Sequence, residues 1–405
     1  MRDAKTAARI QNFGDAEYFA RKRLPAALFQ TYEAGSGSNA TAIANEQAFR
    51  DVMFRPNGNV FNASRDQTTT VLGHQISMPV IASSVGMLKL GHKDGEAGVA
   101  KAAGDAGTLT FTSGATGAPI EEVMARATGP VFYQLYYFGG RDASAAIVER
   151  VKRAGVHGLV LTIDTAAPVT AKERPYPERR SLPLDTSLRE TLKFAPQALS
   201  RPTWTADFLR GGRELKMPMS LRQDGTAMEV FESFPGMYQQ TPDWKDIAWL
   251  REHFDGPLVI KGVLTPEDAR RAVDAGASAV VVSNHGGNAL DGAMPTLKAL
   301  PAIVAAVGDQ TEVLLDSGVR RGSDVLKAMA LGARAVLLGR AYVYALMAAG
   351  EPGVARMFEL FHQQIDESLA FLGVRTPQEL DASFLDLPAG WSEQDRNDRP
   401  LVNVP

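Results

Sequence analysis

The sequence has no cysteine, no long apolar run and almost no excess of charge, and each absence excludes a class of function. Without cysteine among its 405 residues, the chain can form no disulfide, thiolate metal site or cysteine nucleophile. No stretch approaches the ~20 consecutive apolar residues that a membrane-spanning helix needs, so we expect no membrane association. The 43 basic and 46 acidic residues give a net charge of −3, which favours a small-molecule partner over a nucleic acid.

Three sequence signals are also missing. The charged N-terminal segment MRDAKTAARIQNFGDAEYFARKRL lacks the apolar core of a secretory signal, which predicts a cytoplasmic protein. No G-x-G-x-x-G turn follows the first strand-like run, and this disfavours a doubly wound open sheet. No H-E-x-x-H or similar ligand spacing occurs, so metal catalysis is only a minor alternative.

Short apolar runs alternate with amphipathic helical stretches from about residue 78 onward. This βα rhythm predicts an α/β fold, and eight strands are the number that closes a (β/α)8 TIM barrel. The expected strands lie at 79–84, 108–113, 131–136, 158–164, 257–262, 279–286, 312–318 and 335–340. We therefore interpret residues 1–405 as one barrel domain.

Three segments interrupt this rhythm. Residues 10–60 have a helical pattern and are expected to cap the barrel. Residues 170–242, rich in Pro, Arg and Met, leave the end of the fourth strand, where barrel active sites lie, and are interpreted as a lid insertion. A final helix over 354–373 precedes a polar C-terminal tail at 386–405.

Polar residues occur in pairs at the ends of three neighbouring strands. The pairs are Gln134 with Tyr136, Thr162 with Asp164, and Ser283 with His285. Side chains two residues apart on a strand face the same way, and a purely structural barrel lumen is filled by branched apolar chains. The pairs therefore indicate an active site, the alternative being hydrogen-bonded polar groups of the core.

His285 is the only one of the six histidines that closes a predicted strand. It lies in SNHGG, whose glycines allow a sharp turn and a close approach to a ligand. A lone histidine is more often structural, but this one is expected to lie beside Asp164 at the barrel mouth. That carboxylate could orient the imidazole and stabilise its protonated form, which is how a general base works near neutral pH.

The seventh and eighth strands lead into LLDSGVRRGSD and LLGRAY, where barrels of this type bind phosphate. Gly318, Arg320, Gly339 and Arg340 fit that role, because small residues expose backbone N–H groups and arginines add charge. Arg321 is either a further phosphate ligand or a solvated charge at a helix start. Lys261 ends the fifth strand; it could offset negative charge on a reduced flavin, form a Schiff base or pair with a carboxylate.

The chain resembles the FMN-dependent α-hydroxy-acid oxidase and dehydrogenase family, which includes glycolate oxidase, lactate oxidase and mandelate dehydrogenase. The resemblance covers roughly residues 15–375. It rests on LPAALFQTYEAG, FRPN, FYQLY, LTIDT, IKGVLTPEDA, SNHGG, LDSGVRRGSDV and ALGARAVLLGR.

The resemblance implies FMN as cofactor, a fourfold assembly and a role for each matching residue. His285 becomes the base that takes a proton while the flavin takes the hydride, Asp164 its partner, and Tyr136 a hydroxyl on the substrate side. The implied FMN ligands are Ser83, Ser84 and Val85 after the first strand, Ser113, Gln134, Thr162, Lys261 and Ser283 near the ring and ribityl chain, and Asp316, Gly318, Arg320, Gly339 and Arg340 near ribityl and phosphate.

The residues that grip the substrate carboxylate in this family are not matched here. Asn288 stands where the family has an arginine three residues after the histidine, and Thr31 stands where it has a tyrosine. The arginine after the fourth strand falls on an alanine, although Lys172 or Arg174 could take its place. Gly114, where many members carry a bulky aromatic, is expected to widen the same pocket. These departures predict a larger substrate and a less cationic pocket.

Within the family, SNHGGN and DWKDIAWLREHFDGP most resemble the branch that acts on the mycofactocin precursor, a peptide-derived molecule oxidised at a carbon bearing an amine. One alternative is a conventional lactate or 2-hydroxy-acid enzyme that uses Lys172 or Arg174. Another, of a different class, is a non-redox barrel that binds a phosphate ligand.

Overall fold

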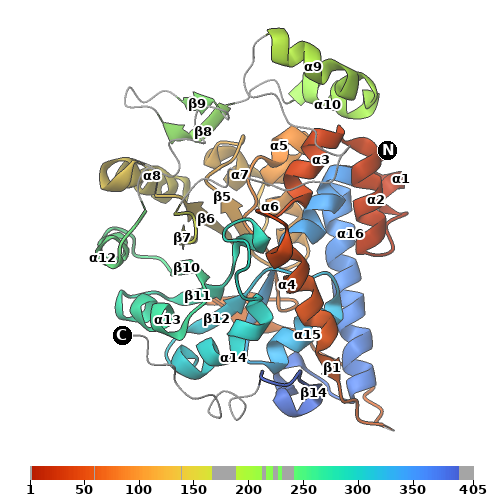
Figure 1. The fold of residues 1–405 in the computed structure, drawn as a ribbon, viewed down its shortest axis with the longest axis vertical. Coiled ribbons are helices and arrows are strands. Elements are labelled where there is room, and N and C mark those ends of the chain that lie inside the picture. The colour runs from red at the N-terminus through yellow and green to blue at the C-terminus, as the bar shows by residue number, and fades with distance from the viewer. Residues whose placement is uncertain are drawn as a thin grey trace.

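A computed structural model describes residues 2–58, 60–137, 139–166, 188–211, 216–221, 227–229 and 241–391. Eight parallel strands close a barrel in which chain order is also spatial order (Figure 1). They are β4 (Val80–Ala82), β5 (Thr110–Ser113), β6 (Val131–Leu135), β7 (Gly158–Thr162), β10 (Leu258–Val263), β11 (Ala279–Val282), β12 (Glu312–Leu315) and β13 (Ala335–Leu338). The predicted (β/α)8 barrel is confirmed.

One layer of apolar side chains fills the lumen, with one residue from every strand. The layer consists of Ile81, Phe111, Phe132, Val160, Val259, Val281, Leu314 and Leu337, which are all fully buried in a single cluster. A hairpin of β2 (Thr69–Val71) and β3 (His74–Ile76) adds Val71, Leu72 and Ile76 to this cluster, so it closes one end of the barrel. The other end carries the carboxyl termini of the strands.

Helices follow the strands as the sequence predicts, and their ends carry ordinary caps. Thr265 accepts a hydrogen bond from the Asp268 N–H, with Pro266 in the first turn, and Gly155 ends its helix in the left-handed conformation. The barrel helices are α5 (Leu88–Gly91), α6 (Gly95–Asp105), α7 (Ile120–Arg126), α8 (Gly140–Ala154), α12 (Trp244–His253), α13 (Pro266–Asp274), α14 (Thr296–Val307), α15 (Gly322–Ala330) and α16 (Arg340–Leu372).

Most strands are a few residues shorter than predicted, and two boundaries change the interpretation of the sequence. β11 stops at Val282, so His285 does not close a strand but begins a short 3-10 turn, η1 (His285–Gly287). The final helix begins at Arg340, well before the predicted start, and is interrupted by non-helical backbone at Ala349 and Gly350. Both η1 and the start of α16 lie directly beyond strand ends, where local turns replace the regular period.

Four helices of the N-terminal segment cover one side of the barrel next to α16 (Figure 1). They are α1 (Arg2–Ala7), α2 (Phe13–Arg23), α3 (Ala26–Glu33) and α4 (Ala40–Asp51). α1 and α2 pack along α16, and α4 packs against α14 and η1. The cap therefore reaches the end of the barrel where His285 lies.

Part of the insertion after β7 is described. Its helices α9 (Leu188–Leu199) and α10 (Pro202–Gly211) rest on the cap, with a strand pair, β8 (Lys216–Leu221) and β9 (Ala227–Glu229), beyond them (Figure 1). Asp207 of α10 forms a buried ion pair with Arg23 of α2, and the Trp204 indole N–H donates to the Leu90 carbonyl at 2.8 Å. These contacts anchor the insertion at the edge of the barrel mouth.

Near the C-terminus, β14 (Leu385–Asp386) pairs with β1 (Met53–Phe54) between the cap and the barrel helices. The short turns η2 (Pro377–Glu379) and η3 (Ala382–Phe384) precede it. Residues 392–405 of the predicted tail lie outside the described residues. Of the helices that the structure describes, none has both the length and the apolarity needed to span a membrane.

Candidate active site

A polar layer lies directly above the apolar layer of the barrel lumen. Two residues beyond each apolar lumen residue, at the end of its strand or directly after it, stands one of the predicted cofactor residues: Ser83, Ser113, Gln134, Thr162, Lys261, Ser283, Asp316 and Gly339. Since alternate strand residues share a face, this spacing brings the eight positions to one end of the lumen. The side chains of Gln134 and Thr162 are hydrogen-bonded to each other, as are those of Lys261 and Ser283.

Backbone contacts fix the first strand end. The Ser83 N–H donates to the Leu338 carbonyl at 2.8 Å, and the Ser83 carbonyl accepts from the Tyr342 hydroxyl at 2.6 Å. Ser84 and Val85 follow, partly exposed at the mouth. On the neighbouring strand the Ser113 hydroxyl accepts from the Ala115 N–H at 3.1 Å. The loops after β4 and β5 are thereby held against the barrel.

His285 and Asp164 meet across the mouth, as the sequence predicts. The His285 Nδ1 and an Asp164 carboxylate oxygen are 3.0 Å apart, and both side chains are largely buried. Burial raises the pKa of Asp164, but the charges of His285 and Lys261 outweigh it and hold that pKa below its ordinary value. Asp164 therefore stays ionised and can stabilise a proton on the imidazole.

Lys261 forms a buried ion pair. Its Nζ lies 2.8 Å from an Asp316 carboxylate oxygen and 2.8 Å from the Ser283 hydroxyl. Burial lowers the pKa of Lys261, yet Asp316 and Asp164 raise it above its ordinary value. A permanently protonated amine is a poor nucleophile, so the geometry favours a fixed positive charge over a Schiff-base lysine.

Tyr136 lies between the base pair and the polar layer. Burial, opposed by the charge of Lys261, raises the pKa of Tyr136 to about 12. Its hydroxyl is also close enough to hydrogen-bond with Gln134 and Ser113. Tyr136 is therefore a neutral hydroxyl at any ordinary assay pH, and can orient a bound polar group without exchanging a proton.

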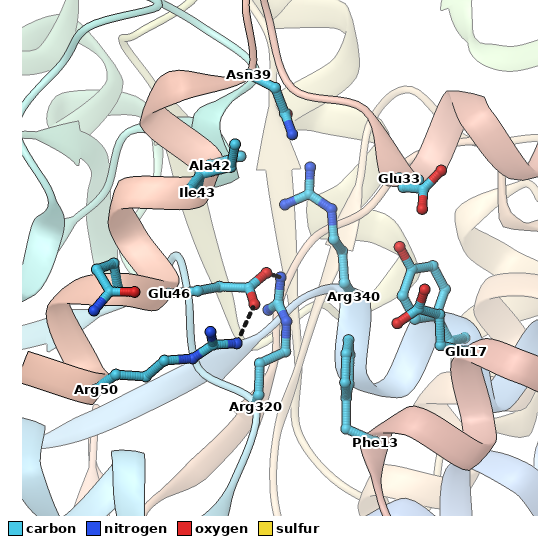
Figure 2. Close-up of a pocket in the computed structure, with 12 residues that line it drawn as sticks. Phe13, Glu17, Glu33, Asn39, Ala42, Ile43, Glu46, Arg50, Arg320 and Arg340 are labelled. Carbon is cyan, nitrogen blue, oxygen red and sulfur yellow. Dashed lines mark hydrogen bonds and ion pairs between the residues drawn. The ribbon is translucent and has the colours of Figure 1, made fainter. Parts of the chain in front are cut away.

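Arg320 and Arg340 both line a cavity of about 330 Å³ between the cap and the start of α16 (Figure 2). Arg320 donates to Glu46 at 2.9 Å and Arg340 to the Gly286 carbonyl at 2.8 Å. Burial and the nearby Arg320 lower the pKa of Arg340. Arg320 already has Glu46 as a partner, whereas the buried Arg340 guanidinium has no carboxylate bonded to it within the described part of the chain and would be stabilised by an anion in this cavity. Arg321, by contrast, is exposed at the start of α15.

The two glycines of the predicted phosphate site differ in what surrounds them. Beside Gly339 no atom lies within 4 Å of where a Cβ would be, so its backbone faces open space at the start of α16. Gly318, with φ +93°, leaves no such space, because a Cβ there would be 2.6 Å from the Asn45 carbonyl oxygen. Close packing against α4 is enough to explain Gly318.

Buried polar atoms without partners test whether FMN fits this site. The part of the chain that the structure describes has twelve buried side-chain N or O atoms that make no hydrogen bond, and Ser84 Oγ, Arg320 Nε and Arg340 Nη2 are three of them. Such atoms are rare in native proteins unless a ligand satisfies them. The Ser84 hydroxyl above the lumen could bond a polar ring or a ribityl chain. The guanidinium groups of Arg320 and Arg340, near the open space at the Gly339 backbone, could bond a phosphate, so the residues fit FMN.

The predicted substrate residues that the structure describes, Thr31, Gly114 and Asn288, are uncharged. The Asn288 amide donates to the His285 carbonyl at 3.1 Å, and the Thr31 hydroxyl donates to the Ala27 carbonyl at 3.0 Å. Lys172 and Arg174 lie outside the described residues. The expectation that Gly114 widens the pocket stays a prediction; a Cβ at this position would lie 2.7 Å from the Gln134 carbonyl oxygen. Gly114 is needed because β6 approaches closely.

Sequence reasoning missed two contributors to the site. Gly262, with φ +106°, leaves room for Asp164, since a Cβ there would be 2.7 Å from the Asp164 Cγ. Its place after Lys261 in a strand was the available signal. Asn284 precedes the base and forms a buried amide pair with Asn45 of the cap, and nothing in the local sequence predicts a contact over that separation.

Comparisons with known proteins agree with this geometry. Residues 20–387 match the family described as FMN-dependent dehydrogenase. Pre-mycofactocin synthase of Mycobacterium tuberculosis is 42% identical over 380 residues, 93% of this chain and 94% of its own. Glycolate oxidase of Spinacia oleracea is 34% identical over 382 residues, 94% and 96% of the two chains. The solved structure of the monotopic membrane protein (S)-mandelate dehydrogenase superposes with a TM-score of 0.85 at 32% identity, covering 94% of this chain and all of the other.

Proposed function

Because this chain belongs to the FMN-dependent α-hydroxy-acid oxidase and dehydrogenase family, we propose that it removes a hydride from a carbon that bears an amine or a hydroxyl. We further propose a larger or peptide-derived substrate in place of a small 2-hydroxy acid. The observation that carries the proposal is the combination of an ordered His285–Asp164 pair with uncharged side chains at Asn288 and Thr31.

His285 acts as the base of the reaction. Its Nε2 takes the proton from the amine or hydroxyl, while the bond to Asp164 holds Nδ1 protonated. The ionised Asp164 then stabilises the imidazolium that results. FMN, when bound, supplies the acceptor for the hydride, and Lys261 provides the fixed positive charge in the polar layer. Tyr136 orients the substrate through its hydroxyl.

The proposed substrate class rests on the missing arginine and tyrosine that bind a substrate carboxylate in this family. An arginine fork to a buried carboxylate contributes ~2–5 kcal/mol, and neither Asn288 nor Thr31 can supply that charge. The base, its partner and the cofactor residues all remain. A changed substrate therefore explains the pattern better than a damaged enzyme. Relatives named pre-mycofactocin synthase are 42% identical, which supports the mycofactocin precursor as the first substrate to test.

The test compares flavin bleaching under anaerobic conditions by four compounds: the amine-bearing mycofactocin precursor, lactate, glycolate and mandelate. We expect bleaching by the precursor and little or none by the three acids. The double variant Thr31→Tyr with Asn288→Arg should gain oxidation of lactate or glycolate, by a factor of hundreds for a few kcal/mol of restored binding. Rapid bleaching of the unmodified protein by lactate would establish a conventional 2-hydroxy-acid enzyme with another carboxylate ligand, and a colourless protein would establish a non-redox barrel.

We also infer a fourfold assembly from the family resemblance. Phe61 and Phe371 are 89% and 79% exposed, which is consistent with a surface that a second copy covers. Light scattering should give a mass four times that of the 43.6 kDa chain. A mass of one chain at micromolar concentration would contradict the inference.

A further inference from the structure

The backbone around the base is in a conformation that the chain would not adopt alone. His285, Gly286 and Gly287 have φ values of 59°, 64° and 80°, so three consecutive residues are left-handed. For a residue with a side chain this conformation is unfavourable, and it persists only where surrounding contacts determine it. The contacts that hold η1 therefore decide where the imidazole lies.

The most extensive of these contacts comes from the cap. The Asn45 amide of α4 donates to the Asn284 side-chain oxygen at 2.8 Å, and the Asn284 amide donates back to the Asn45 side-chain oxygen at 2.8 Å. Both side chains are only 2% exposed. A closed pair of buried amides fixes two planes relative to each other, because each amide serves as donor and acceptor at once.

The same Asn284 side chain braces the turn. Its oxygen accepts from the Gly287 N–H at 3.1 Å, and its amide donates to the Met294 carbonyl at 3.1 Å. Asn45 also accepts from the Thr296 N–H at 3.3 Å. The Asn284 side chain therefore links the start of the segment 284–294 to its end at Met294. Asn45 fixes the orientation of the Asn284 side chain.

α4 also approaches this segment through its backbone. A Cβ on Gly287 would lie 2.6 Å from the Ala42 nitrogen, one turn before Asn45. The close approach allows the short side chain of Asn45 to reach Asn284. The other contacts of η1 are the Ser36 N–H and hydroxyl, which both donate to the Gly287 carbonyl at 2.7 and 3.1 Å, and single groups such as the Ser317 hydroxyl on the Gly286 N–H at 2.9 Å and Arg340 on the Gly286 carbonyl.

From this geometry we propose that Asn45 is a positioning residue for His285: the cap helix sets the catalytic turn through the Asn45–Asn284 amide pair. The proposal rests on the proposed function only in taking His285 as the base. Asn45 itself touches neither substrate nor cofactor. Its effect on the reaction passes through Asn284 and the left-handed turn.

The first measurement needs no substrate. Hydrogen–deuterium exchange on the FMN-loaded protein should show faster amide exchange across 284–294 in Asn45→Ala, with FMN content unchanged. The matched control is Asp51→Ala at the end of the same helix: its exposed carboxylate accepts from the Gln47 amide, and its loss should leave exchange in 284–294 unaltered. Exchange in Asn45→Ala equal to wild type would overturn the proposal, even if the proposed substrate proves wrong.

The second measurement uses Asn45→Asp, which separates positioning from mere stability. A carboxylate cannot donate to the Asn284 oxygen, whereas a protonated carboxyl group can, so the pair forms only at low pH. The quantity to measure is the flavin bleaching rate of the variant divided by that of wild type, with the proposed amine-bearing precursor as substrate. This ratio should fall about tenfold as pH rises through the pKa of the introduced carboxyl group, which burial raises above its ordinary value. Taking a ratio cancels the titration of His285. A ratio independent of pH would refute the proposal, and the low-pH form serves as the folded reference if Asn45→Ala fails to fold.

Discussion

Replacing Asp164 by Asn tests how much the carboxylate contributes to the base. The Asp164 oxygen and the His285 Nδ1 are 3.0 Å apart, which places the centres of the two charges roughly 4 Å apart. At an effective dielectric constant of ~20, opposite charges at that separation attract by about 4 kcal/mol. If the imidazolium is half formed at the transition state, Asp164→Asn removes about 2 kcal/mol of transition-state stabilisation, which lowers the rate roughly 30-fold.

The assay is single-turnover bleaching of the flavin under anaerobic conditions, with the amine-bearing precursor. FMN content should be unchanged, because the arginines and the polar layer do not depend on Asp164. Asp386→Asn is a matched control, since that carboxylate pairs with Arg55 on the surface and its loss should leave the rate unchanged. A rate within threefold of wild type in Asp164→Asn would refute the reasoning that an ionised Asp164 stabilises the proton on His285.

Three further predictions follow from single side chains. Tyr136→Phe should slow flavin bleaching while leaving the shape of its pH profile up to pH 10 unchanged, because the pKa of Tyr136 is about 12; a lost alkaline limb would contradict this. Arg320→Gln should lower FMN content in the purified protein more than Tyr136→Phe does, measured by absorbance, and equal losses would count against a phosphate role. His92, whose Nε2 lies 3.6 Å from an Asp3 carboxylate oxygen, and Arg2 hold the pKa of Asp3 below its ordinary value of 3.8 against the opposing effect of burial. Because the folded-state pKa of Asp3 is lowered, its stabilisation is complete above pH ~4 and is lost only as pH falls through that lowered pKa, so Asp3→Asn should lower the melting temperature at pH 7, by about 1 kcal/mol of stability, and by less at pH 3; no loss at pH 7 would exclude ionised Asp3 as a stabilising group.

The sequence predicts the parts of the fold that have a regular period, namely the barrel strands and the helices between them. Alternation along each strand placed the eight strands and the polar layer above them, because side-chain direction in a strand depends only on sequence spacing. Prediction failed where the regular period ends. The sequence predicts a strand up to residue 286, but contacts impose a left-handed backbone on η1. The motif SNHGG alone does not reveal those contacts.

Long-range packing accounts for the other failures. Asn45 and Asn284 are 239 positions apart, so no local pattern joins them. At Gly114 the carbonyl of Gln134 on the next strand limits what fits, and the sequence around Gly114 does not reveal that carbonyl. Both cases require the positions of neighbouring backbone, which composition and spacing do not supply.

The packing of α1 and α2 along α16 has a consequence during protein synthesis. The cap helices are made first, and the helix that buries Ala16, Ala20 and Leu24 begins only at Arg340. At ~5–20 residues per second, the ribosome needs roughly 15–60 s to reach it. Throughout that interval the apolar face of the cap has no partner and is a candidate surface for chaperones. Because α4 belongs to the same cap, the turn that carries His285 is expected to reach its final geometry among the last steps of folding.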